Sequence, residues 1–247
     1  MAFILRCHDS IKLEQSILGM QISTEMISGK TQAHLSILDN TRGLGDVCLL
    51  HPDVVKPFLT MQEAAAKEGL DLRVASGFRS YERQLSIWNA KATGQRYLLN
   101  DNGQPIDSNS LCDIEKLYAI LRWSALPGCS RHHWGTDLDV WDVAAVPDNY
   151  SLQLVPEEYQ QGGSFYLLNC WLGEHAETYG FVRPYAIDRG GVAPEPWHLS
   201  YLPIAKQFEA QMSITFVRKI LDNSNLALAK EAVDNLDDIW CQFICTS

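Results

Sequence analysis

The chain has 247 residues, of which 46% are hydrophobic and 20% are charged, and this is the composition of an ordinary globular protein. Thirty acidic and twenty basic residues give a formal net charge of −10 at pH 7, without a long basic run. This balance argues against a nucleic-acid partner or an anionic membrane held by bulk charge. No window approaches about 18 uninterrupted apolar residues, which excludes an integral membrane segment.

The N-terminus and the cysteines bear on the compartment. An apolar run of five residues opens the chain, whereas a secretory signal needs about seven to fifteen. The seven cysteines are scattered and form no CxxC pair, which favours free thiols in a reducing compartment. We therefore expect a cytoplasmic protein, and a periplasmic or cell-envelope location with a longer N-terminus stays open as the alternative.

The first half of the chain alternates between helical and strand patterns. Residues 52–69 have apolar side chains spaced by three and four and end at a glycine, which predicts an amphipathic helix. Residues 72–76 alternate like a strand, and Ser80 can cap a helix that runs to about Ala92. Arg79 is then expected in the turn between this strand and this helix.

The second half continues the alternation. Turn residues at 100–105 precede a helix expected around 111–125, and residues 136–143 are typical of a strand. Apolar residues on one face predict a helix over 165–179. Residues 194–202 are expected to be extended, since a proline in this segment disfavours helical geometry at the residue before it.

Histidines and carboxylates form a pattern that fits a metal site. His132 lies just before the predicted strand that holds Asp137 and Asp139, and His198 follows Glu195 by three residues. A catalytic zinc site needs three protein ligands, an open fourth position and a nearby carboxylate that handles protons. One histidine and one aspartate from the first unit and His198 from the second meet this count, and Glu195 is the spare carboxylate. Residues three apart in an extended segment face roughly opposite ways, so Glu195 needs a bend at the following proline to reach the site.

Three strings in the chain carry a resemblance to a known family. Ser130–Asp139 matches the pattern Ser-x-His-x-x-Gly-x-Ala-x-Asp, except that Asp137 stands where the family has Ala. Glu195–His198 matches the downstream Glu-x-x-His, with the usual tryptophan before the histidine. Ser76–Tyr81 and Gln84 are similar to an upstream Ser-Gly-Tyr-Arg-Ser-Tyr block, with Phe for the first Tyr. The chain thus resembles the VanY-like D-alanyl-D-alanine carboxypeptidases, which are LAS zinc metallopeptidases.

The resemblance implies roles for individual residues. It implies one zinc ion per chain with His132, Asp139 and His198 as ligands. It further implies that Glu195 is the catalytic base and that Arg79 stabilises the oxyanion that develops on the scissile carbonyl.

Other residues of the three strings carry less specific expectations. Ser130 is expected to hydrogen-bond substrate or to cap its loop, and Gln84 to face substrate or to be polar surface. Asp137 and Asp139 are two residues apart on a strand and so face the same side. Asp137 is therefore expected to orient a ligating histidine or to compete with Asp139 as a ligand.

The resemblance also divides the chain. It spans about residues 40–205, which we interpret as a zinc D,D-carboxypeptidase-like catalytic domain. Residues 1–39 then form an N-terminal extension. Residues 206–247 form a C-terminal helical appendage, with a partner-binding element as the alternative.

The expected fold is α+β, a small, mainly antiparallel sheet with flanking helices, a zinc site at the sheet edge and helical additions at both ends. The expected function is zinc-dependent release of terminal D-Ala from peptidoglycan stem peptides or other peptides that contain D-Ala-D-Ala. In this reaction Glu195 assists attack by zinc-bound water. An L,D-carboxypeptidase or a peptidoglycan endopeptidase on the same fold is an alternative. A non-catalytic module that retains zinc is another, although the presence of Glu195 and Arg79 argues against it. The oligomeric state stays open.

Overall fold

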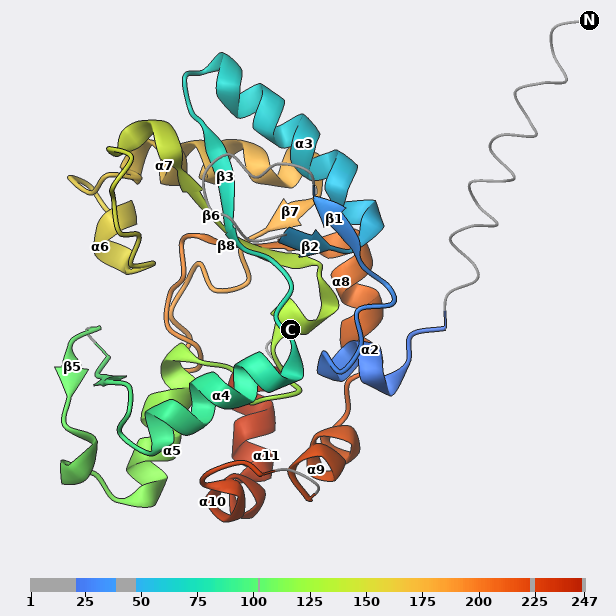
Figure 1. Ribbon diagram of the computed structural model, residues 1–247, viewed down its shortest axis with the longest axis vertical. Coiled ribbons are helices and arrows are strands. Elements are labelled where there is room, and N and C mark those ends of the chain that lie inside the picture. Colours follow the sequence, from blue (N-terminus) through green and yellow to red (C-terminus); the bar gives the residue numbers. More distant parts are fainter. Residues whose placement is uncertain (1–20, 39–47, 102, 223–224, 246–247) are drawn as a thin grey trace, which may run out of the picture.

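The computed structural model describes residues 21–38, 48–101, 103–222 and 225–245. Most of the expected N-terminal extension, including the short apolar run that bears on export, lies outside the described residues. Helices and short strands alternate along the chain, and the strands pair antiparallel in small sheets (Figure 1). The expected α+β fold is confirmed.

The main sheet has four antiparallel strands in the order β3-β6-β8-β7. These strands are β3 (Leu72–Ser76), β6 (Asp137–Asp142), β8 (His198–Tyr201) and β7 (Phe181–Val182). Two smaller sheets pair β1 (Ser36–Leu38) with β2 (Cys48–Leu50), and β4 (Leu98–Leu99) with β5 (Pro105–Ile106). Strand β3 has the predicted bounds, and β6 begins and ends one residue inside the predicted strand over 136–143.

Some helices pack on the main sheet, and a second group of helices lies beside it. The α-helices are α2 (Thr24–Ser28), α3 (Pro52–Lys67), α4 (Tyr81–Ala92), α5 (Asp113–Trp123), α6 (Pro156–Tyr159), α7 (Tyr166–His175), α8 (Leu202–Glu209), α9 (Ile214–Asp222), α10 (Ala229–Asp234) and α11 (Leu236–Ile239). Short turns of tighter or wider helix are η1 (Ser108–Ser110), η2 (Arg131–Trp134), η3 (Val143–Ala145), η4 (Ala176–Tyr179) and η5 (Trp240–Ile244). The helix predicted over 165–179 is thus α7 followed by η4.

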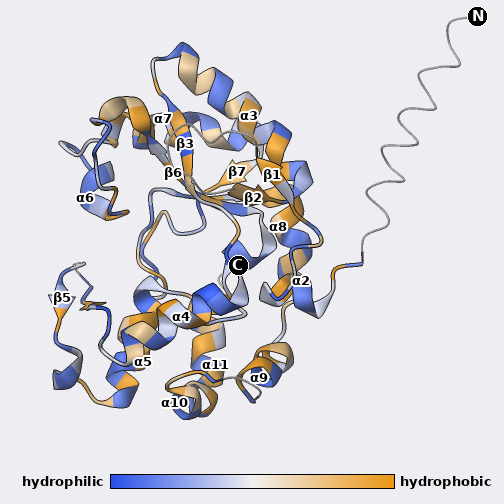
Figure 2. Cartoon of the chain, in the orientation of Figure 1, coloured by the Kyte–Doolittle hydropathy of each residue, from blue (hydrophilic) through white to orange (hydrophobic). Residues whose placement is uncertain are grey.

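Helix α3 follows from its sequence pattern. The His51 side chain accepts a hydrogen bond from the backbone of the first turn, and Pro52 occupies the first helical position, where no N–H is needed. The buried residues of α3 are Val54, Phe58, Met61 and Ala65. Apolar and polar residues alternate around this helix (Figure 2), so its apolar face packs on the sheet and its polar face meets solvent.

The connection from β3 to α4 is tightly specified. Ser80 caps α4 as predicted, because its Oγ accepts a hydrogen bond from the backbone N–H of Arg83 at 3.2 Å. Gly77 precedes this cap, and a Cβ there would lie 2.9 Å from the carbonyl oxygen of Leu49 and 2.8 Å from Cys48 Sγ. Only glycine therefore lets the chain pass this close to β2.

Two large hydrophobic clusters hold the described chain together. The first lies between the main sheet, α3 and α7 and includes Phe58, Met61, Leu138, Leu172 and Phe181. The second joins α4 and α5 to the C-terminal helices and includes Trp88, Leu117, Ile120, Val217, Leu236 and Ile239. Figure 1 shows the first group above and the second below. Burying each large apolar side chain contributes about 1.5–3 kcal/mol.

The C-terminal helices are attached to α4 by hydrogen bonds as well as by apolar packing. Trp88 Nε1 donates to the carbonyl oxygen of Ala227 at 2.9 Å, and Asn89 Nδ2 donates to the carbonyl oxygen of Asn225 at 3.0 Å. The predicted domain boundary between residues 205 and 206 stays a prediction, but residues beyond it complete the core under α4.

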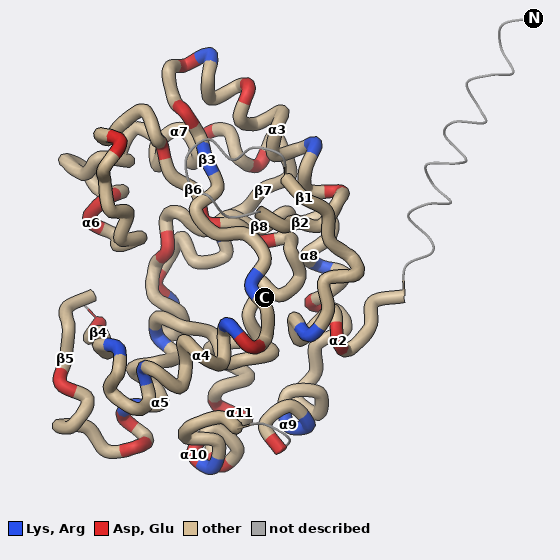
Figure 3. Tube along the Cα trace, viewed as in Figure 1, with Lys and Arg blue, Asp and Glu red and all other residues tan. Residues whose placement is uncertain are grey.

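Charged residues of both signs are spread over the whole chain rather than gathered on one element (Figure 3). None of the helices in the described part of the chain combines the length and the apolar character needed to cross a bilayer.

Candidate active site and metal centre

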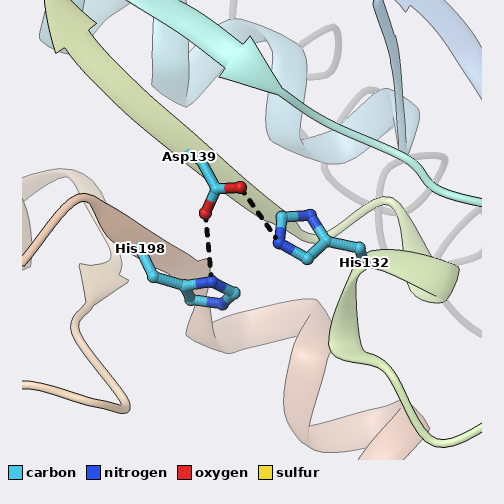
Figure 4. A group of neighbouring side chains, drawn as sticks. All are labelled: His132, Asp139 and His198. Carbon is cyan, nitrogen blue, oxygen red and sulfur yellow. Dashed lines mark ion pairs between the residues drawn. The ribbon is translucent and has the colours of Figure 1, made fainter. Parts of the chain in front are cut away.

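Strand pairing brings the three expected metal ligands together. The register of β6 and β8 sets Asp139 directly opposite His198. His132 reaches the same place from η2, which ends at Gly135 with a φ of 70°. A Cβ at Gly135 would lie 2.9 Å from the backbone nitrogen of His51, so this turn needs glycine. The three side chains point toward one another (Figure 4) from the two central strands and η2, not from an outer strand of the sheet.

The geometry of the three residues suits a small cation. His132 Nε2 lies 3.4 Å from Asp139 Oδ2, and His198 Nδ1 lies 3.2 Å from Asp139 Oδ1. One ligand atom from each residue lies within 4.8 Å of the others, and all three side chains are buried. Zinc is bound by this combination of histidine nitrogen and carboxylate oxygen.

Hydrogen bonds fix which nitrogen of each ring faces the centre. His132 Nδ1 donates to the carbonyl oxygen of Gly77 at 2.9 Å, and His198 Nε2 donates to Asp137 Oδ2 at 2.9 Å. The inner nitrogens can therefore offer lone pairs to a metal. Within the described chain, Asp139 Oδ1 and His198 Nδ1 are buried atoms without a hydrogen-bond partner. Because unpaired buried acceptors are costly, a cation at this point fits the residues present.

Electrostatics also favour positive charge at this point. Burial alone would lower the pKa of His198, but the adjacent carboxylates of Asp137 and Asp139 raise it to about 10. Burial alone would raise the pKa of Asp139, but His132 and His198 hold it well below its ordinary value. A metal would take the place of the proton that these carboxylates otherwise draw to His198.

Glu195 lies beside this centre because the chain turns at Pro196. The backbone N–H of His198 donates to the carbonyl oxygen of Glu195 at 3.1 Å, which closes the turn. Glu195 Oε2 consequently lies 3.4 Å from His198 Nδ1. The expected bend is present. The prediction of an extended chain over 194–202 is wrong at the turn of residues 196–197 and at Leu202, where α8 begins. Burial raises the pKa of Glu195 to about 7.

Arg79 occupies the expected turn between β3 and α4. Its backbone N–H donates to the carbonyl oxygen of His132 at 3.0 Å, and its Nη2 lies 4.0 Å from Asp139 Oδ2. Arg79 Nη1 donates to Gln84 Oε1 at 3.0 Å, and Nη2 donates to Ser76 Oγ at 3.3 Å. The guanidinium is therefore held against the candidate metal centre.

Gln84 has a different environment from the two that were expected. It is fully buried, so it is not polar surface. Its Oε1 accepts from Arg79, and its Nε2 donates to the carbonyl oxygen of Ala125 at 2.7 Å. Both ends of the amide are thus engaged within the protein, and they hold Arg79 in place.

Asp137 is the centre of a buried polar network behind His198. Besides His198 Nε2, its Oδ2 accepts from Arg131 Nε at 2.7 Å, and its Oδ1 accepts from Ser200 Oγ at 2.9 Å. Arg131 also pairs with Glu209 at the end of α8. Asp137 contacts the outer nitrogen of the ring, which is the arrangement of a residue that orients a metal ligand.

A cavity of about 240 Å³ opens beside these residues. Ser130, Glu195 and Trp197 line it together with the three candidate ligands and Arg79. The sequence reasoning did not single out several further lining residues, namely Lys91, Trp123, Ser124, Gln153, Leu154 and Tyr185. A helical signal could have found Lys91, which lies seven residues after Gln84 and so on the same face of α4.

Comparisons with known proteins agree with the motifs. The family model VanY, D-alanyl-D-alanine carboxypeptidase, matches residues 48–204. An uncharacterised protein of Haemophilus influenzae is 43% identical over 107 residues, which cover 43% of this chain and 72% of that protein. The bifunctional D-Ala-D-Ala dipeptidase and D-Ala-D-Ala carboxypeptidase VanXYC of Enterococcus gallinarum is 27% identical over 167 residues, which cover 66% of this chain and 73% of that protein.

A solved structure has a similar fold. The structure of the LdcB LD-carboxypeptidase superimposes with a TM-score of 0.50 at 22% identity and covers 80% of this chain and 76% of that one. This likeness concerns the fold, whereas the family model matches well over half of the chain. The chain belongs to the VanY family of D-alanyl-D-alanine carboxypeptidases.

Proposed function

We propose that the protein is a zinc-dependent carboxypeptidase that releases terminal D-Ala from peptidoglycan stem peptides. The observation that carries this proposal is the meeting of three buried side chains, His132, Asp139 and His198, two of which present atoms without a hydrogen-bond partner in the described chain. In this proposal these residues hold one zinc ion. When bound, zinc would acidify a water molecule and polarise the scissile carbonyl.

Glu195 handles the proton in this mechanism. It accepts a proton from the water that attacks the carbonyl and then donates it to the leaving amine of D-Ala. Its position beside His198 and its lining of the cavity support this role. A pKa of about 7 suits a group that must both accept and release a proton near neutral pH.

Arg79 stabilises the negative charge that develops on the carbonyl oxygen. Its hydrogen bonds to Gln84 and Ser76 prearrange the guanidinium, so little reorganisation is needed as the charge forms. Gln84 contributes through Arg79 rather than by direct contact. Ser130 is buried and lines the cavity, which supports a hydrogen bond from this residue to the bound peptide.

The proposal is tested by digesting a panel of peptides with and without a chelator and measuring released alanine. A pentapeptide that ends in D-Ala-D-Ala should lose one D-Ala, its analogue that ends in L-Ala should not react, and zinc should restore activity after chelation. Cleavage of the tetrapeptide alone would instead assign an L,D-carboxypeptidase, and cleavage within longer peptides an endopeptidase. Zinc binding without any turnover would identify a non-catalytic module.

A further inference from the structure

Lys91 is a charged group in the cavity that the proposed mechanism does not use. It lies near the end of α4, and its side chain lines the same cavity as Glu195 and Arg79. Its Nζ donates to Ser124 Oγ at 2.6 Å, and Ser124 follows the last residue of α5. The ammonium is thus fixed at the wall of the cavity, where the proposed mechanism gives it no role.

The surroundings of Lys91 leave its charge without a bonded carboxylate. Its hydrogen-bond partner is the neutral hydroxyl of Ser124, and among the described residues no carboxylate lies within ion-pair distance. Burial and the nearby charges of Arg96 and Arg79 lower its pKa to about 8, while Glu195 acts in the opposite direction. Lys91 therefore remains mostly charged at neutral pH, and a partly buried charge of this kind favours an anionic partner.

The other cations of the cavity are already engaged. Arg131 pairs with Asp137 and Glu209, and Arg79 is held beside Asp139. Within the described lining, Lys91 is therefore the cation best placed to meet an anion that a ligand brings.

The substrate of a carboxypeptidase brings such an anion. We propose that Lys91, together with Ser124, binds the C-terminal carboxylate of the substrate peptide and thereby selects peptides that end one residue after the scissile bond. This inference rests on the proposed function. Glu195 and Lys91 line the same cavity, and the substrate carboxylate lies only one residue, about 3.8 Å, beyond the scissile carbonyl.

The test compares two substrates that differ only in this carboxylate. The pentapeptide ending in D-Ala-D-Ala and its C-terminal amide are digested by the zinc-loaded wild type, Lys91→Gln, Lys91→Arg and Arg83→Gln. Lys91→Gln keeps a hydrogen-bond donor for Ser124 but removes the positive charge, whereas Lys91→Arg keeps the charge. Arg83→Gln is the control, because it removes an exposed positive charge from the same helix. Thermal melting of each variant checks that it is folded.

The wild type should prefer the free acid by about 10–100-fold in kcat/KM, as expected for a hydrogen bond to a charged group. Lys91→Gln should lose most of this preference through a higher KM for the acid, with the amide nearly unchanged, and Lys91→Arg should recover part of it. Arg83→Gln should behave as the wild type. Equal cleavage of acid and amide by the wild type would overturn the proposal. So would an equal loss for both substrates in Lys91→Gln, which would indicate that Lys91 acts only on the charge of Glu195.

A binding measurement separates this proposal from the proposed function. Calorimetry with D-Ala-D-Ala and its amide does not require turnover. If the wild type cleaves neither peptide, the proposed function fails. The carboxylate site is then still supported if the wild type binds the acid more tightly and Lys91→Gln does not, and it is overturned if both proteins bind acid and amide alike.

Discussion

Replacing Asp137 by Asn should weaken zinc binding although Asp137 is not itself an expected ligand. Its Oδ2 accepts from His198 Nε2 at 2.9 Å and from Arg131 Nε at 2.7 Å, and it is fully buried. Asn can still accept from these two donors through its amide oxygen. Its NH₂ then faces the hydroxyls of Ser200 and Thr136, which donate to Asp137 Oδ1 and must turn to accept instead. The substitution therefore removes mainly the negative charge behind His198.

The magnitude follows from the kind of hydrogen bond that is lost. A bond to a charged group contributes about 1.5–3 kcal/mol, and a neutral one about 0.5–1.5 kcal/mol. The difference of roughly 1–1.5 kcal/mol corresponds to about a tenfold weaker zinc affinity for Asp137→Asn. Asp137→Ala removes the contact to His198 altogether and should cost up to about 100-fold.

Zinc affinity is measured by competition with a chromogenic chelator, on protein shown by circular dichroism to be folded. This check is needed because Asp137 also neutralises the buried Arg131, and breaking a buried ion pair costs up to about 3–5 kcal/mol of unfolding free energy. Asp142→Asn is the matched control. Asp142 is a buried carboxylate on the same strand, but it accepts from the backbone N–H groups of Asp71 and Ala144.

The control should bind zinc as tightly as the wild type. Unchanged affinity in both Asp137→Asn and Asp137→Ala would refute the inference that Asp137 orients His198. An equal loss in Asp142→Asn would show that the effect arises from general weakening of β6.

Four further outcomes are expected. Glu195→Gln should keep its zinc and lose about 10²–10⁴ in kcat, because the proton acceptor is gone; a near-normal kcat would mean that another group takes the proton. Asp139→Ala should lose most of its zinc in metal analysis, since its carboxylate faces both histidines, and full occupancy would contradict this ligand set. Arg79→Gln should lower kcat by about 10²–10³ and change KM less, because Arg79 acts on the charge of the transition state. A raised KM with little change in kcat would instead assign Arg79 to ground-state binding of the substrate. Ile239→Ala should lower the unfolding free energy in urea by about 2–5 kcal/mol, because this side chain is fully buried against the core under α4, whereas a loss below about 0.5 kcal/mol would make the C-terminal helices peripheral.

Local elements of this protein could be predicted because their determinants are local. The alternation over 72–76 defines β3, and the hydroxyl of Ser80 needs only its own backbone neighbours to start α4. The candidate ligands could also be named from the sequence, because the residue types in two short strings meet the ligand count of a zinc site and the family resemblance implies His132, Asp139 and His198 among them. For Glu195, the sequence showed that a bend at the following proline was needed, and this bend brings Glu195 beside His198 in the structure.

Only the tertiary structure determined which hydrogen bonds these side chains form with one another. Asp137 could have been a ligand or an orienting group, and only its pairing with the outer nitrogen of His198, a residue 61 positions away, distinguishes the two. Gln84 has the pattern of a substrate contact, but the carbonyl oxygen of Ala125 and the guanidinium of Arg79 bury both ends of its amide. Lys91 belongs to no motif, and its side chain lines the cavity because α5 packs beside α4. A hydrogen-bond partner distant in the chain leaves no periodic trace in the sequence, since it depends on how the strands and helices pack and not on any one segment.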